Sequence, residues 1–168
     1  MIAQKDFANT ARYQVANAAL TGSSEGRVVL LGNSITDAWA SRDSAFFARN
    51  NFVGRGISGQ TSPQLLVRFR QDVVDLKPEI VVIHIGTNDI AENTGPYDQA
   101  FTLGNITSMI DIAEQNGIKV VLASVLPATQ FNWRKELGDR SGMILKLNEA
   151  LKQLAINRQI AYLDYHSA

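Results

Sequence analysis

The chain has 168 residues, its 16 lysine and arginine residues balance 16 aspartate and glutamate residues, and it contains no cysteine. This length suffices for one domain with a sizeable core. Zero net charge gives no general attraction to nucleic acid or anionic membranes, and the lack of cysteine excludes disulfides and thiolate or cysteine-metal chemistry. No apolar run is long enough to span a membrane, and residues 1–5 do not resemble a signal peptide. The sequence therefore does not determine the cellular compartment.

Apolar spacing predicts alternating helices and strands through the first half of the chain. Residues 6–20 carry apolar side chains at helical spacing, which predicts a first helix that packs on a sheet. A continuous apolar run at 28–31 predicts a strand buried on both faces. A short helix, a second strand over 52–57 and an amphipathic helix over 62–76 follow.

The second half alternates in the same way. Its expected elements are a third strand over 80–85, a helix over 98–115, a fourth strand over 118–125, a long loop over 126–140, a last helix from Ser141 and a last strand over 160–165. A loop of that length is usually functional or mobile. Strands that alternate with helices predict a parallel sheet with helices on both faces.

The first strand stops at a turn that presents a serine. Gly32 and Asn33 end the strand, and Ser34 follows at its carboxyl end. Ligands bind outside the carboxyl ends of the strands of an open parallel sheet, which makes Ser34 a candidate nucleophile. The alternative interpretation is that Ser34 caps the following helix. On this stretch alone, both interpretations stay open.

Two further strands end in polar turns that contain glycine, over 56–60 and 86–89. In a parallel sheet these turns lie at one edge together with Ser34. Acyl transfer needs a nucleophile and hydrogen-bond donors for the oxyanion that develops on the attacked carbonyl. The backbone N–H of Ser34, the N–H of Gly59, where no Cβ obstructs a substrate, and the side-chain amide of Asn88 are candidate donors. Each turn alone is ordinary turn chemistry, but together they indicate an acyl-transfer site.

Over nearly its whole length the chain resembles the SGNH hydrolases, also called the GDSL family of esterases and lipases, through GNSIT, GRGISGQT and GTND. The resemblance implies that Ser34 is the nucleophile and that Gly59 and Asn88 are oxyanion donors. It also implies a flavodoxin-like three-layer α/β/α sandwich, a five-stranded parallel sheet of order 2-1-3-4-5, and cofactor-free, metal-free hydrolysis of a small-molecule ester through an acyl-enzyme. The sequence of these motifs is most similar to the platelet-activating-factor-acetylhydrolase-like branch of the family.

Two departures from the family pattern concern the neighbours of the nucleophile. Asn33 replaces the usual aspartate, which removes a charge but keeps hydrogen-bonding capacity. The family's fifth block, an aspartate and a histidine separated by two residues, is not found. A serine needs an adjacent base at neutral pH, and the chain has only two histidines. His84 reads as a core residue inside a strand, whereas His166, two residues after Asp164, is a candidate base.

We therefore expect residues 1–168 to form a single SGNH hydrolase domain that lacks its carboxyl-terminal Asp-His segment and last helix. Such a chain keeps the oxyanion hole and loses the base, so only residual catalysis is expected. It also exposes an apolar strip of the sheet, which predicts association such as a homodimer. Acetylated sugars, short acyl esters and lysophospholipids all fit as substrates.

Two rival functions belong to other classes. A flavodoxin-like binding module would hold a phosphate with residues 56–60 before a helix N-terminus, but no P-loop lysine follows Gly59. A catalytically impaired relative would bind ester-bearing glycans without turnover. The first rival gives Ser34 and Asn88 no role, and the second keeps the site but removes the chemistry.

Several other polar and aromatic residues have assignable roles. Trp39 is expected in the core rather than in an acyl pocket, and Asp89 is expected to accept backbone N–H groups in its turn. Arg55 is a candidate contact for an anionic substrate, whereas Arg68 and Arg70 are expected on a solvated helix face. The candidate substrate contacts in the long loop are Phe131, Trp133 and Arg134.

Overall fold

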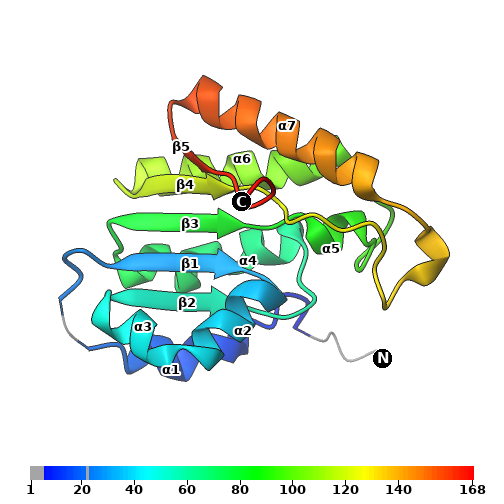
Figure 1. Cartoon of the computed structure of the whole chain (residues 1–168). Coiled ribbons are helices and arrows are strands. Elements are labelled where there is room, and N and C mark those ends of the chain that lie inside the picture. Colours follow the sequence, from blue (N-terminus) through cyan, green and yellow to red (C-terminus); the bar gives the residue numbers. More distant parts are fainter. Residues whose placement is uncertain (1–5, 22) are drawn as a thin grey trace.

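A computed structural model describes residues 6–21 and 23–168 and contains one five-stranded sheet in which every pair of neighbouring strands is parallel. Its strands are β1 (Val28–Gly32), β2 (Phe52–Gly56), β3 (Ile80–His84), β4 (Lys119–Ala123) and β5 (Ala161–Leu163). Their order is β2-β1-β3-β4-β5, which confirms the predicted topology (Figure 1). The strand order reverses at β1, so the crevice outside the ends of β1 and β3 is the expected ligand position.

Helices lie on both faces of this sheet. They are η1 (Thr10–Tyr13), α1 (Gln14–Ala18), α2 (Ser34–Arg42), α3 (Ser44–Arg49), α4 (Ser62–Asp72), η2 (Val74–Leu76), α5 (Thr87–Ile90), α6 (Gln99–Gln115), η3 (Lys135–Leu137) and α7 (Ser141–Arg158). In Figure 1, α2 and α3 lie in front of β2, and α4 and α6 lie behind the sheet. The three-layer α/β/α arrangement is therefore present. No helix in the described part is both long enough and apolar enough to cross a membrane.

The two faces of the sheet differ in burial. Every second side chain of β1 and β3 points toward α4 and α6, and those on this face, such as Val29 and Ile83, are fully buried. On the opposite face Val82 and Val121 are only half-buried, and Leu163 is 37% exposed. Apolar side chains are therefore partly exposed on this face, and the expected exposure of the sheet by a missing helix and the association of two chains both stay predictions.

The amino-terminal segment differs from its prediction. Residues 6–20 were expected to form one helix with an apolar stripe on the sheet, but Phe7 and Val15 are exposed. Asn9 adopts a left-handed φ of 50°, which separates the first turn from the short helices that follow. Polar contacts attach the segment instead, since the Asn17 side chain accepts a hydrogen bond from Arg55 Nε at 2.8 Å. Arg55 is thereby buried in a structural contact, which argues against the anionic-substrate role.

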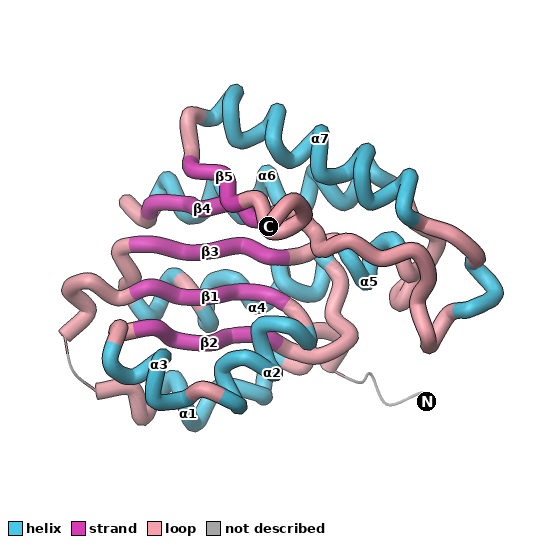
Figure 2. Tube along the Cα trace, viewed as in Figure 1, coloured by secondary structure: helices cyan, strands magenta, loops and turns pink. Residues whose placement is uncertain are grey.

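The parallel register aligns the three strand ends that carry the polar turns. Gly32 of β1 pairs with Gly56 of β2 and with His84 of β3. The turns that follow these residues therefore begin at the same edge, and Figure 2 shows their loops gathered there. A Cβ at Gly56 would lie 2.3 Å from the Asp37 backbone nitrogen, so the glycine permits α2 to pack directly against the end of β2.

The prediction that Arg68 lies on a solvated face is wrong, although Arg70 on the same helix is exposed. Arg68 is fully buried and pairs with Asp72 at 3.0 Å. Its guanidinium also donates to the Gln60 side chain at 2.7 Å and to the Gly32 carbonyl at 3.2 Å. The helical period placed this arginine toward β1, where buried polar partners satisfy its donors.

Replacing Arg68 by methionine leaves Asp72 buried without its cation. We expect Arg68→Met to lower the free energy of unfolding by about 3 kcal/mol or more. Arg70→Met is the matched control on the exposed side of α4, and its effect should stay within about 0.5 kcal/mol. Urea denaturation followed by circular dichroism measures both. Equal effects of the two substitutions would contradict the assigned network.

Candidate active site

Ser34 is the first residue of α2 and is exposed at the carboxyl edge of the sheet. The alternative that Ser34 caps this helix is wrong, because the cap is Asn33, whose side-chain oxygen accepts a hydrogen bond from Ile35 N at 3.3 Å. Asn33 is buried and thus supplies the hydrogen-bonding capacity expected of it. In the described part of the chain, no side chain forms a hydrogen bond with the Ser34 hydroxyl, which leaves it open to a ligand.

Gly59 lies in the turn between β2 and α4, exposed and with a left-handed φ of 80°. The residue before it is fixed to the helix that carries Ser34. Asp37 Oδ2 accepts hydrogen bonds from Ser58 Oγ at 2.9 Å and from Ser58 N at 3.3 Å. Asp37, to which sequence reasoning assigned no role, therefore connects the first turn with the second.

Asn88 holds the residue after Gly59. Its side chain is buried and donates from Nδ2 to the Gln60 carbonyl at 2.9 Å. A side-chain amide has two N–H donors, so this bond fixes the group and leaves a second donor for a ligand. Gly59 thus lies between Ser58, bound by the Ser34 helix, and Gln60, bound by Asn88. The turns that carry Ser34 and Asn88 thus both bind the segment around Gly59, so the structure brings the three predicted turns together.

Asp89 accepts a hydrogen bond from its own backbone N–H, as expected, and it also binds the first residue of α4. The Ser62 backbone N–H donates to its two oxygens at 3.0 and 3.1 Å, and Ser62 Oγ donates at 2.5 Å. Burial raises the pKa of Asp89, and the hydrogen bonds from Ser62 and Thr102 oppose that shift. Asp89 therefore fixes the start of α4 to the third turn and does not face the exposed edge.

His84 lines an apolar cavity of about 250 Å³ together with Ile35, Trp39 and Tyr165. Burial lowers the pKa of His84 to about 4, and a hydrogen bond with the Ser124 backbone opposes the shift. Among the described residues, nothing hydrogen bonds to its Nε2. The imidazole is therefore neutral at pH 7. Trp39, expected in the core, is 38% exposed and packs against Phe46 with ring centroids 5.5 Å apart.

His166 does not form a carboxylate-imidazole pair with Asp164. The Asp164 carboxylate accepts backbone N–H groups from His166 and Ser167, both at 3.1 Å, and these bonds lower its pKa. The cavity that His166 lines includes Pro127 and neither Ser34, Gly59 nor Asn88. Neither of the two histidines therefore forms a hydrogen bond with Ser34, the candidate nucleophile.

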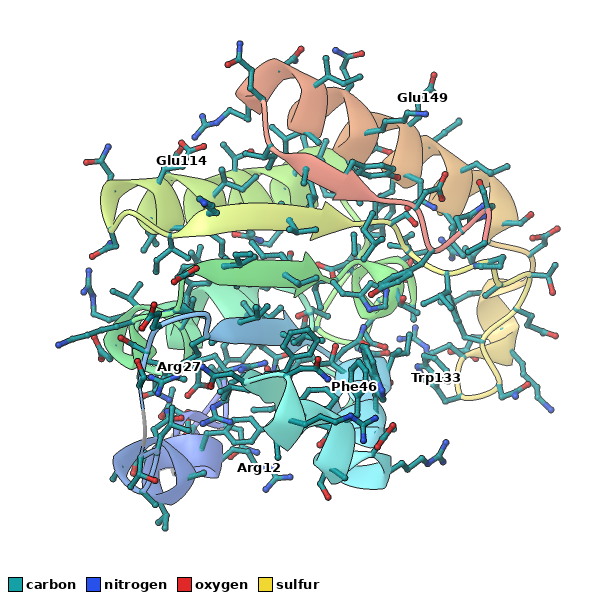
Figure 3. The ribbon with its side chains drawn as sticks, turned by 60° about the vertical axis from the view of Figure 1, so that its left-hand side comes forward. Arg12, Arg27, Phe46, Glu114, Trp133 and Glu149 are labelled. Carbon is teal, nitrogen blue, oxygen red and sulfur yellow. The ribbon has the colours of Figure 1, made fainter. Side chains whose placement is uncertain are left out.

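The long loop contacts the segment that follows α5 through Arg134 and Trp133, and the Trp133 indole N–H donates to the Asn93 side chain at 3.0 Å. Arg134 donates to the Ala91 and Glu92 carbonyls at 3.0 and 2.8 Å, so it anchors the loop. Phe131 is buried, and its ring lies 5.2 Å from that of Trp133. Trp133 is 56% exposed and lies on the outer loop in Figure 3. Only Trp133 therefore offers a broad apolar surface to a ligand.

The described residues contain no group of three or more histidine, aspartate or glutamate side chains that could bind a metal ion. The candidate site offers a hydroxyl, a glycine peptide held between two fixed residues and a side-chain amide. These groups can attack a carbonyl carbon and stabilise a negative charge on its oxygen.

The sequence profile of the GDSL-like lipase/acylhydrolase family matches residues 30–168, and the chain belongs to this family. The family is one of lipases and acylhydrolases. The crystal structure of a GDSL-like lipase from Bacteroides thetaiotaomicron VPI-5482 is 49% identical, with a TM-score of 0.93 over 96% of this chain and 80% of that chain.

Two more distant relatives share parts of the sequence or the fold. An uncharacterized lipoprotein of Bacillus subtilis (strain 168) is 31% identical over 90 residues, which span 52% of this chain and 37% of the lipoprotein. An acetylxylan esterase from Geobacillus stearothermophilus is 18% identical, with a TM-score of 0.66 over 84% of this chain and 77% of that chain. The second likeness shows the fold alone.

The buried His84 predicts a pH dependence of stability. Its pKa is about 4 in the folded chain and 6.5 when unperturbed. Between these values the unfolded chain binds a proton that the folded chain does not, so the free energy of unfolding falls as the pH drops. We expect His84→Gln to lose up to about 3 kcal/mol less stability than the unsubstituted chain over this range. Urea titrations at several pH values measure the difference, and parallel curves would contradict the assignment.

Proposed function

We propose that the chain hydrolyses carboxylic esters, with Ser34 as the nucleophile. The oxyanion donors are the backbone N–H groups of Ser34 and Gly59 and the side-chain amide of Asn88. The observation that carries the proposal is the position of Gly59 between two residues held by the elements that bear Ser34 and Asn88. Donors fixed before the reaction stabilise the developing charge without reorganisation.

The reaction proceeds in two steps. Ser34 Oγ attacks the ester carbonyl carbon, its proton passes to a base, and the carbonyl oxygen becomes an oxyanion. Collapse of this intermediate breaks the carbonyl carbon–oxygen bond, the base returns its proton to the departing oxygen, and the alcohol leaves while the acyl group stays on Ser34. Water then attacks the acyl-enzyme, releases the acid and restores the hydroxyl.

Neither His84 nor His166 is arranged to receive the proton of Ser34, since His84 is buried and His166 lines a different cavity. We propose that the imidazole for full activity comes from a segment outside these 168 residues. By themselves, the described residues then give residual hydrolysis from nucleophile and oxyanion hole. The same observation favours a second candidate, a site that binds ester ligands without efficient turnover.

The proposed substrates are short-chain acyl or acetyl esters, including those on carbohydrates. The acetyl ester is proposed by analogy with an acetylxylan esterase of the same fold, and this analogy does not identify the alcohol. The exposed indole of Trp133 supports an alcohol with a flat apolar face, such as a sugar ring. The substrate therefore remains a class of ester rather than one compound.

Hydrolysis of p-nitrophenyl acetate tests the proposal. We expect slow release of p-nitrophenol that Ser34→Ala reduces to the background. Asn88→Ala should lower kcat about 100-fold, or to the background, because one oxyanion donor is lost. Ser41→Ala on the same helix is the matched control and should retain the activity, as should His166→Ala. Unchanged hydrolysis by Ser34→Ala would refute the assigned nucleophile, and loss of activity in His166→Ala would restore that histidine as the base.

A further inference from the structure

Asn93 joins the long loop to the Gly59 turn through one side chain. It follows α5 and is half-buried. Its Nδ2 donates to the Gly59 carbonyl at 3.0 Å, and its Oδ1 accepts from Trp133 Nε1 at 3.0 Å. A carbonyl only accepts and an indole N–H only donates, so a single orientation of the amide satisfies both partners. The side chain is therefore fixed by the turn on one side and by the loop on the other.

Asn93 and Asn88 act on consecutive peptide groups. Asn88 holds the Gln60 carbonyl, and Asn93 holds the Gly59 carbonyl. The two asparagines are themselves connected, because Asn93 N donates to the Asn88 carbonyl at 3.1 Å. Glycine with a positive φ rotates its peptide groups at little steric cost. The hydrogen bond to the Gly59 carbonyl therefore limits rotation at the residue whose N–H is the proposed oxyanion donor.

The partner on the loop side is accessible to a ligand. Trp133 is 56% exposed, although its ring contacts the buried Phe131 and the neighbouring Arg134 anchors the loop to the Ala91 and Glu92 carbonyls. A molecule that contacts the indole therefore contacts a group hydrogen-bonded to Asn93. One side-chain amide lies between this exposed surface and the Gly59 carbonyl.

We propose that Asn93 is a positioning residue that couples the seating of Trp133 to the direction of the Gly59 N–H. The inference rests on the proposed ester hydrolysis, in which this N–H is an oxyanion donor. An ester whose alcohol part reaches the indole then influences the oxyanion hole through Asn93. A small ester such as p-nitrophenyl acetate responds mainly to the fixed state of the turn.

Asn93→Asp separates the two hydrogen bonds, because a carboxylate accepts from Trp133 and cannot donate to the Gly59 carbonyl. We expect a 10- to 100-fold decrease in kcat, with KM for p-nitrophenyl acetate within about twofold. Trp133→Phe keeps an aromatic ring and loses the indole N–H, and we expect it to decrease kcat about threefold to tenfold. Asn132→Ala, an exposed substitution in the same loop, is the control and should leave both constants unchanged.

The double variant Asn93→Asp with Trp133→Phe tests the coupling. If the loop acts through Asn93, Trp133→Phe has no further effect on kcat once the bond to Gly59 is lost. Independent, multiplying effects would overturn the coupling, and an unchanged kcat in Asn93→Asp would overturn the positioning role.

Hydrogen exchange over residues 57–61 reads the turn without any activity. Faster exchange in Asn93→Asp than in Asn132→Ala is expected, and equal exchange would also overturn the inference. If the chain shows no Ser34-dependent hydrolysis at all, the proposed function fails, whereas the exchange difference still reports whether Asn93 fixes the turn. The two failures are thereby distinguishable.

Discussion

The Gly59 turn is held from both sides by residues of other elements, and the remainder of the candidate site depends on this constraint. A glycine at φ 80° has little intrinsic rigidity. Asp37 binds the preceding Ser58, while Asn88 binds the following Gln60. These bonds need α2 and α5 at the same sheet edge, which the aligned register of β1, β2 and β3 provides. The sheet thus positions the Gly59 peptide without adding bulk near it.

Arg68 supports this arrangement from inside the fold. Burial lowers the pKa of its guanidinium, and Asp72 opposes that shift by hydrogen bonding and charge. A buried ion pair adds little net stability when it is compared with apolar packing, so its hydrogen bonds to Gly32 and Gln60 matter more than its charge. They connect the end of β1 with the turn that carries Gly59. The site therefore has a polar layer beneath it, between the exposed edge and the apolar core.

The sequence predicted the strands well because continuous apolar runs and glycine turns are local signals. It also placed Ser34, Gly59 and Asn88 at one edge, since parallel strands leave no other position for their turns. The amino-terminal helix was mispredicted because the conformation of Asn9 and the polar contacts of Asn17 override an apolar period. Arg68 was misplaced because, although Asp72 lies one turn further along the same helix, its other partners Gly32 and Gln60 lie outside the helix and do not appear in a helical pattern. Asp37 and Asn93 were missed because their partners lie 21 and 34 residues away.

The most direct test of the account is the trapping of an acyl-enzyme. The protein is incubated with p-nitrophenyl acetate, quenched in acid and analysed by peptide mass spectrometry. The account predicts one acetyl group on the peptide that contains Ser34, absent from Ser34→Ala and reduced in Asn88→Ala. Because no imidazole is seen to activate water at this site, the acyl group should persist long enough to be detected. Acetylation that is equal in Ser34→Ala, or that is confined to lysine side chains, would contradict the assignment of Ser34 as the nucleophile.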